Sequence, residues 1–274
     1  HRVSGSDLRA SAITADLRRE GITVYIGHDA EHLPADADLV IISSAVPADN
    51  PEIVAAREKG IPVLKRAEVL GAMMAGKVGI AVAGTHGKTT ITALIAFTLL
   101  RAGWDPTFIV GGVLQDLSTN ARAGAGPHFV IEADEYDHTF LGLRPQLAVV
   151  TNIEMDHPDC YPTLESMVEA FRRFLALVPP DGCIVGCGDE DRVRGILGEL
   201  EGIPRITYGL GSDVDWQATD IREHGGGGSD FVARYRGRDV GRFFIRLPGI
   251  HNVQNALAVL AVAQHLGVEQ ETVR

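Results

Sequence analysis

The chain has 274 residues, of which 45% are hydrophobic and 22% charged, a composition typical of an ordinary globular protein with about two domains. Its formal net charge of −11 disfavours nucleic acid as the main partner, because an acidic surface repels phosphate backbones. No apolar run approaches the roughly 18 residues of a membrane helix, and no signal peptide is recognisable. We therefore expect a cytoplasmic protein without a membrane partner. The three cysteines are too few for a disulfide framework, which agrees with a reducing compartment.

The first 70 residues alternate short apolar runs with helical patterns. Strands are predicted over Thr23–Ile26, Ala37–Ser43 (buried) and Ile61–Leu64, and helices over Ala10–Glu20 and Asn50–Lys59. This alternation predicts a parallel, doubly wound sheet. Such a unit normally opens with a strand and a Gly-rich turn, which are not found here. We therefore expect residues 1–76 to be the later part of a Rossmann-like domain, with a small complete α/β unit as the alternative.

The pattern restarts at Val78, after a predicted boundary near Gly71–Lys77, so that a second domain spans residues 77–274. An apolar strand, VGIAVA, leads into the loop GTHGKTT and then into a helix over Thr89–Ala102. Further strands are predicted over Phe129–Glu132, Leu147–Asn152, Asp181–Val185, Asp215–Arg222 and Phe231–Arg236, with a helix over Leu164–Val178 and a flexible connector at Gly225–Gly228. The fold class expected for this part is a P-loop-type α/β domain with a mostly parallel sheet.

The loop GTHGKTT has the features of a phosphate-binding loop. Unpaired N–H groups and the dipole at a helix N-terminus attract phosphate, and Gly84 and Gly87 allow a close backbone approach. Lys88 would contact the β- and γ-phosphates, and the hydroxyl of Thr89 would bind magnesium. Val82 stands where the longest form of the motif has glycine, so this is a shorter variant. The predicted ATP contacts are Gly84, Thr85, His86, Gly87, Lys88, Thr89 and Thr90; a Gly-rich turn with a solvated lysine is the alternative.

Acidic and polar side chains follow the next two predicted strands. They are Glu132, Asp134, Glu135 and Asp137 in the first segment, and Asn152, Glu154, Asp156 and His157 in the second. Clustered acids repel one another unless a cation neutralises them, which favours a magnesium site over a solvated acidic turn. In parallel sheets ligands bind beyond the carboxyl ends of strands, so the phosphate loop and both segments should share one edge. We expect His157 to bind metal or to orient a phosphate oxygen.

Two asparagines near the C-terminal end have two possible roles. Asn252 and Asn255 lie in PGIHNVQN, at the start of an Ala-rich helix. An asparagine amide offers both a donor and an acceptor, as reading an adenine edge requires. Asparagine is also an ordinary helix cap, and the sequence leaves both interpretations open.

Taken in order, GTHGKTT, EADEYD, TNIEMDH and PGIHNVQNA resemble the ATP-dependent Mur ligases of peptidoglycan precursor synthesis. SGSDL, SSAVPADNPEIVAA and IPVLKRAEVL extend the resemblance over essentially the whole chain. It implies an enzyme of three domains, for UDP-sugar, for ATP and for the incoming amino acid. The present chain would be truncated at both ends and would lack the amino-acid-binding domain.

The resemblance also implies roles for single residues. Lys88, Glu132 and His157 would be the catalytic residues, with Lys88 on phosphate. Thr89 and Glu132 would bind one magnesium ion, and Glu132 and His157 a second. Asn252 and Asn255 would lie near adenine, and the UDP-sugar would contact Ser43, Ser44 and Ala45.

The activity implied is amide-bond formation between L-alanine and UDP-N-acetylmuramate, through an acyl phosphate made with ATP. Phe171 stands where several sister ligases carry a modified lysine, which favours the alanine-adding member. The alternatives are a ligase that recycles murein tripeptide onto the same UDP-sugar, and a nucleotide-binding module without turnover. A third alternative is a P-loop NTPase that hydrolyses ATP to drive a motion. It is disfavoured because the sequence shows no arginine-finger context and no second, Walker-like strand that ends in aspartate. The choice of amino acid rests on resemblance alone.

Overall fold

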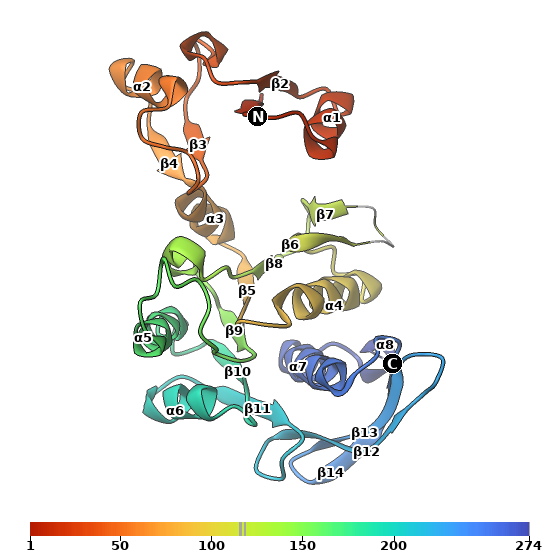
Figure 1. Ribbon diagram of the computed structural model, residues 1–274. Helices are drawn as coiled ribbons and strands as arrows, with labels where there is room; N and C mark the ends of the chain where they lie inside the picture. Colours follow the sequence, from red (N-terminus) through yellow and green to blue (C-terminus); the bar gives the residue numbers. More distant parts are fainter. Residues whose placement is uncertain (115–116, 118, 274) are drawn as a thin grey trace. The chain divides into compact units, whose positions relative to one another are not determined.

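The computed structural model describes residues 1–114, 117 and 119–273 and is drawn in Figure 1. The chain divides into two compact units, His1–Val69 and Leu70–Arg274. No helix in the described part of the chain is long and apolar enough to cross a membrane.

The first unit contains two small parallel sheets. Its elements are β1 (Ser4–Asp7), α1 (Ala12–Arg19), β2 (Thr23–Ile26), the 3-10 helix η1 (Ala30–His32), β3 (Val40–Ile42), α2 (Pro51–Glu58) and β4 (Val63–Lys65). Strand β1 pairs with β2, and β3 pairs with β4, each in parallel. The helix α3 (Arg66–Met74) begins in this unit and ends in the next. Alternating strands and helices with parallel pairing confirm the predicted α/β class for this part, although its strands form two separate sheets and not the single sheet that was expected.

The prediction of a long buried strand over Ala37–Ser43 is wrong in its length and its burial. Only Val40–Ile42 is a strand, and Ile41 is 53% exposed. The reason is the small size of the sheet. Successive side chains of a strand point to opposite faces, so a two-stranded sheet with one covered face leaves Ile41 open to solvent.

The second unit is built on one sheet of ten strands. The strands are β5 (Val78–Ala83), β6 (Thr107–Leu114), β7 (Thr119–Arg122), β8 (His128–Glu132), β9 (Leu147–Val150), β10 (Cys183–Cys187), β11 (Arg205–Gly209), β12 (Trp216–Glu223), β13 (Ser229–Tyr235) and β14 (Arg238–Ile245). Their order is β14-β13-β12-β11-β10-β9-β5-β8-β6-β7. Strands β12 to β6 along this order run parallel. At the two edges the pairing is antiparallel, between β6 and β7, between β12 and β13, and between β13 and β14. The predicted mostly parallel sheet is confirmed.

Helices cover both faces of this sheet (Figure 1). The central strand β5 shows the two sides, because Ile80 and Val82 pack in one apolar core and Ala81 and Ala83 in the other. The first core contains α4 (Lys88–Arg101) and α7 (Ile250–Leu266), and the second contains α5 (Leu164–Leu175) and α6 (Asp191–Glu199). Strand β5 is therefore buried on both faces, which explains why its sequence is a continuous apolar run.

Several boundaries differ from those predicted by a few residues, and β6, β7 and β14 were not predicted. Strand β6 contains Gly111 and Gly112, and glycine weakens the strand signal of a sequence. The helix predicted over Leu164–Val178 ends at Leu175, whereas its start is set by Thr163. The Thr163 hydroxyl accepts a hydrogen bond from Ser166 N in a capping box.

Candidate functional site

The order of the strands brings three segments to one edge of the large sheet. Strands β8 and β9 lie on either side of β5, and all three are parallel, so their carboxyl ends point the same way. Hydrogen bonds join the phosphate loop to the end of β9: Thr85 N donates to Asn152 O (3.0 Å), and His86 N donates to Asn152 Oδ1 (2.8 Å). The structure thus places the loop at 84–90 between the two acidic segments, at the edge where parallel sheets bind ligands.

The phosphate loop has the backbone conformation that its glycines allow. Gly84 has a φ of 134°, and a Cβ atom at this position would lie 1.9 Å from Thr151 Oγ1. Helix α4 begins at Lys88, directly after Gly87, so its unpaired N–H groups lie at the loop. Val82, which departs from the longer motif, is a buried residue of β5. The loop therefore starts two residues later because the strand continues through position 82.

Lys88 is held by a buried carboxylate. Its Nζ lies 2.8 Å from Glu135 Oε1 and also donates to the carbonyl oxygen of Gly84 (2.5 Å). Glu135 is fully buried, and its second oxygen, Oε2, has no hydrogen-bond partner in the described structure. Burial raises the pKa of Glu135, and the neighbouring Lys88 opposes that rise. Glu135 was not among the predicted site residues, because nothing in the sequence distinguishes it from the other acids of its cluster.

Thr89 and Glu132 lie together, as expected of two ligands of one ion. Thr89 Oγ1 donates to both carboxylate oxygens of Glu132, at 2.9 and 3.0 Å. The backbone N–H of Gly111, on β6, donates to Glu132 Oε2 at 2.7 Å and fixes the carboxylate from the other side. A hydroxyl and a carboxylate are oxygen ligands of the kind that magnesium prefers. These two side chains therefore fit a magnesium ion next to the phosphate loop.

His157 lies near the same region but beside different carboxylates. Its Nε2 is 3.9 Å from Glu135 Oε1 and 3.6 Å from Asp156 Oδ2. In the described structure Glu135, Asp156 and His157 form the one group of three metal-ligating side chains within 4.8 Å of one another, and Glu132 is not part of it. A second metal position at His157 thus stays a prediction, and Glu135 and Asp156 are its neighbours.

A cavity of about 310 Å³ lies next to the phosphate loop. It is lined by His86, Gly87, Thr151, Asn152, Cys187, Glu190, Tyr208, His251, Gln254 and Asn255. Asn255 lines it directly, whereas Asn252 supports Asn255 by accepting a hydrogen bond from Asn255 Nδ2 (3.0 Å). The helix-cap interpretation of Asn252 is wrong, since the N-cap of α7 is Gly249. An adenine contact is thus geometrically open to Asn255.

The residues predicted to contact a UDP-sugar lie outside the phosphate-loop site. Ser43, Ser44 and Ala45 follow β3 in the first unit and are exposed, and their role toward a UDP-sugar stays a prediction.

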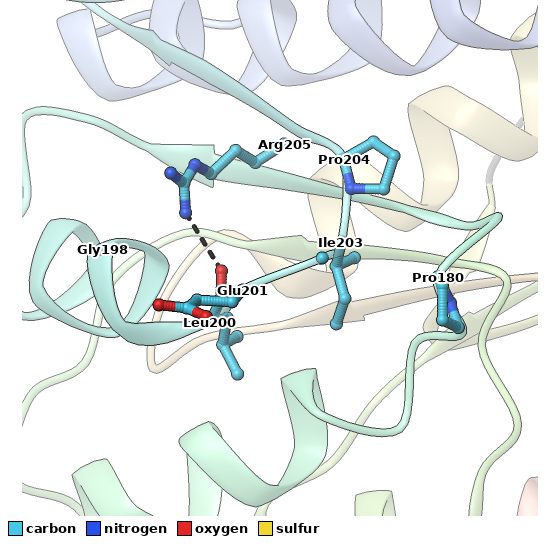
Figure 2. Close-up of a pocket in the computed structure, with 8 residues that line it drawn as sticks. Pro180, Gly198, Leu200, Glu201, Ile203, Pro204 and Arg205 are labelled. Atoms are coloured by element: carbon cyan, nitrogen blue, oxygen red, sulfur yellow. Dashed lines mark hydrogen bonds between the residues drawn. The ribbon is translucent and has the colours of Figure 1, made fainter.

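A hollow of about 580 Å³, drawn in Figure 2, lies at the start of β11, the opposite end from the phosphate-loop edge. Pro180, Leu200 and Arg205 are among its lining residues, and none of the predicted site residues is.

Comparison with known families identifies the fold. Residues 82–263 match the Mur ligase middle domain, and residues 1–78 match the Mur ligase family, catalytic domain. The chain belongs to the Mur ligase family. The two matched regions meet near the predicted boundary at 76/77, which itself stays a prediction.

Individual relatives of this Mur ligase agree with that assignment. UDP-N-acetylmuramate–L-alanine ligases from Geobacter sp. (strain M21) and Bradyrhizobium sp. (strain ORS 278) are 48% and 43% identical over the whole chain. The chain spans 59% and 60% of their lengths. Among solved structures, UDP-N-acetylmuramate–alanine ligase from Thermotoga maritima is 30% identical, with a TM-score of 0.85. The match includes 99% of the present chain and 61% of the Thermotoga chain.

A second solved structure is a ligase named for a peptide and not for alanine. UDP-N-acetylmuramate:L-alanyl-gamma-D-glutamyl-meso-diaminopimelate ligase from Neisseria meningitides is 32% identical with a TM-score of 0.88. It is matched over 99% of this chain and 88% of its own. The fold of this Mur ligase is therefore shared by enzymes that add an amino acid and enzymes that add a peptide.

The buried ion pair generates a stability prediction. The substitution Lys88→Met leaves Glu135 charged and without its partner, which should cost about 3–5 kcal/mol in free energy of unfolding near pH 8. The pKa of Glu135, already raised by burial, rises further without the ammonium group. A carboxyl whose pKa is higher in the folded than in the unfolded state contributes stability that is lost as pH rises through its folded-state pKa. The destabilisation caused by Lys88→Met should therefore be smaller near pH 5.5 than near pH 8. Urea unfolding at both pH values measures it.

The double variant Lys88→Met/Glu135→Gln is the matched control for this experiment. It has no buried charge to protonate, so its stability should recover in part near pH 8, and its difference from the wild type should vary less with pH. Equal losses for Lys88→Met at both pH values would contradict the account of Glu135.

Proposed function

We propose that the protein of which this chain is part is an ATP-dependent ligase that joins L-alanine to UDP-N-acetylmuramate in peptidoglycan precursor synthesis. The observation that carries this proposal is the arrangement of Lys88, Thr89 and Glu132 around the N-terminus of α4. The L-alanine ligase relatives, at 43–48% identity, support the choice of substrates. The substrates and ATP are metabolites of the cytoplasm, where we place the reaction.

In this proposal the phosphate loop holds the β- and γ-phosphates of ATP. Lys88 already lies at the loop, with its ammonium group on the carbonyl oxygen of Gly84, so a small movement brings it to a phosphate oxygen. The N–H groups at the start of α4 supply further donors. Thr89 and Glu132 would hold magnesium, which when bound neutralises charge on the phosphates. His157, with Glu135 and Asp156, is available to a second ion.

The reaction requires positioning and charge neutralisation more than covalent chemistry by the protein. The carboxylate of the sugar attacks the γ-phosphate of ATP, and ADP leaves as the acyl phosphate forms. The amine of L-alanine then attacks the acyl phosphate, and the amide is formed with loss of a proton and release of phosphate. Among the described cysteines, Cys183 and Cys187 are buried, and burial raises the pKa of each thiol to about 11. Neither is a thiolate at neutral pH, so they do not offer a competing nucleophile.

The second candidate is a ligase that adds murein tripeptide to the same UDP-sugar. It is favoured by one observation, the TM-score of 0.88 to the Neisseria peptide ligase. We rank it below the alanine ligase because the relatives that are 43–48% identical over the chain carry the alanine-ligase name.

Phosphate release by the full-length protein separates these two candidates. With ATP, magnesium and UDP-N-acetylmuramate, we expect release to depend on L-alanine and to be at least about tenfold slower with glycine or murein tripeptide. A preference for the tripeptide would establish the second candidate. Release that does not depend on UDP-N-acetylmuramate would contradict both.

A glycine beside Glu132 gives a sharper test of the magnesium ligands. A Cβ atom on Gly111 would lie 2.5 Å from Glu132 Oε2, so Gly111→Ala must displace the carboxylate from the position in which it now contacts Thr89. We expect the gain in ATP affinity that magnesium provides to fall by about tenfold, with affinity in the presence of a chelator little changed. Isothermal titration calorimetry with and without magnesium measures both.

The neighbouring substitution Gly112→Ala is its matched control. A Cβ atom on Gly112 would meet only Thr89 Cγ2, at 3.5 Å, an ordinary contact. In Gly112→Ala, magnesium should therefore increase the affinity for ATP by the same factor as in the wild type. If both alanine variants respond to magnesium as the wild type does, Glu132 is not a ligand of the ion.

A further inference from the structure

Tyr161 joins the segment that follows β8 to the segment that follows β9. Its side chain is fully buried, in the apolar core that also contains Phe140 and Phe171. The hydroxyl of Tyr161 donates a hydrogen bond to the carbonyl oxygen of Glu135. The backbone N–H of the same residue donates to the carbonyl oxygen of His157, at 2.9 Å. Tyr161 therefore holds Glu135 with its side chain and His157 with its main chain.

Both segments have backbone conformations that need such support. Asp137, His138 and His157 have φ values of 51°, 55° and 51°, in the left-handed region that is unfavourable for residues other than glycine. Conformations of this kind persist where surrounding contacts over-determine them. The carbonyl oxygen of Glu135 accepts from His138 N (3.0 Å) as well as from the Tyr161 hydroxyl. The hydroxyl is thus attached to the turn that determines where the Glu135 side chain begins.

The two residues that Tyr161 holds belong to the group of three metal-ligating side chains. His157 Nε2 lies 3.9 Å from Glu135 Oε1 and 3.6 Å from Asp156 Oδ2. Glu135 is fully buried, and its Oε2 has no hydrogen-bond partner in the described part of the chain. An unpaired oxygen of a buried carboxylate is unfavourable in itself and suits a cation, so the group fits a divalent ion. An ion site requires ligand distances that are correct to within about 0.2 Å, so the separation of the two segments determines how well both reach one ion.

We propose that Tyr161 is a positioning residue that sets the separation of Glu135 and His157 and thereby the affinity of the nucleotide site for its second divalent ion. The inference rests on the proposed function, since it takes this ion to accompany ATP. Tyr161 acts through the backbone of both ligands and does not contact the ion. The first ion, at Thr89 and Glu132, is held by contacts to the phosphate loop and to β6 and should not depend on Tyr161.

The test counts the manganese ions that bind to this chain together with a non-hydrolysable ATP analogue. The chain is kept slightly in excess over the analogue, and free manganese is measured by electron paramagnetic resonance. The wild type should bind two ions for each bound nucleotide. The variant Tyr161→Phe keeps the ring and loses only the hydroxyl. It should bind one ion within about threefold of the wild-type affinity and the other at least about tenfold more weakly, as expected when the support of a metal ligand is removed.

Tyr235→Phe is the matched control for loss of a tyrosine hydroxyl. Tyr235 lies on β13, where its ring packs against Trp216, and three strands separate β13 from β9 in the sheet. Both ions should bind to this variant with the wild-type affinities. Melting temperatures of the two variants establish that they are folded. A general loosening of the fold would weaken both ions and the nucleotide together, whereas a positioning role weakens one ion alone.

The outcomes distinguish the inference from the proposed function on which it rests. If the wild type does not bind the analogue, the proposed function fails and the inference with it. If the wild type binds the analogue with one ion only, nucleotide binding stands and the inference is overturned. Wild-type affinity for both ions in Tyr161→Phe, or equal weakening of both, also overturns it. So does a Tyr161→Phe chain that does not fold, because the hydroxyl would then be a requirement of the fold and not of the ion.

Discussion

The ion pair between Lys88 and Glu135 is the interaction on which the phosphate loop depends. A fully buried carboxylate is costly unless a cation and hydrogen bonds compensate it, and here the cation comes from the first residue of α4. The pair joins the segment after β5 to the segment after β8. Because Lys88 also donates to Gly84 O, the same ammonium group holds the loop closed on itself. Protein stability and the position of the phosphate-binding lysine are therefore coupled.

The sheet order makes this pair possible and provides the rest of the site. Strand β5 lies between β8 and β9, so that the loop after β5 has Glu132 and Glu135 on one side and Asn152 and His157 on the other. Helix α7 packs beside α4 on one face of the sheet and brings Asn255 to the phosphate loop. Elements that are far apart in the sequence thus meet at one edge, each through a short segment that follows a strand or begins a helix.

Much of this arrangement could be predicted from the sequence because its signals are local. An apolar strand, a Gly-rich loop with Lys88 and a helix follow one another without a gap, and the acids at Glu132 and Glu135 come directly after an apolar run. The rule that parallel strands deliver ligands at their carboxyl ends then predicts that these segments meet. The contact of Thr89 with Glu132 agrees with that expectation.

The parts that were not predicted depend on tertiary structure. Asp134 and Glu135 are neighbouring acids, but Asp134 is exposed and Glu135 is buried just before η2 (Tyr136–Gly142), a difference that the sequence does not show. Tyr161 and Glu135 are separated by 26 residues and meet only because the segments after β8 and β9 pack in one core. The apolar run at Ala37–Ser43 gave a misleading signal, since apolar residues do not show how many strands will cover them.

A crystal structure of this chain with a non-hydrolysable ATP analogue and manganese tests the central claim most directly. We expect Lys88 Nζ within about 3 Å of a phosphate oxygen, and anomalous density for the ion within about 2.3 Å of Thr89 Oγ1 and a Glu132 oxygen. The base should lie in the cavity lined by Gln254 and Asn255. A nucleotide bound elsewhere, or one bound at the loop while Lys88 makes no contact with it, would contradict the account.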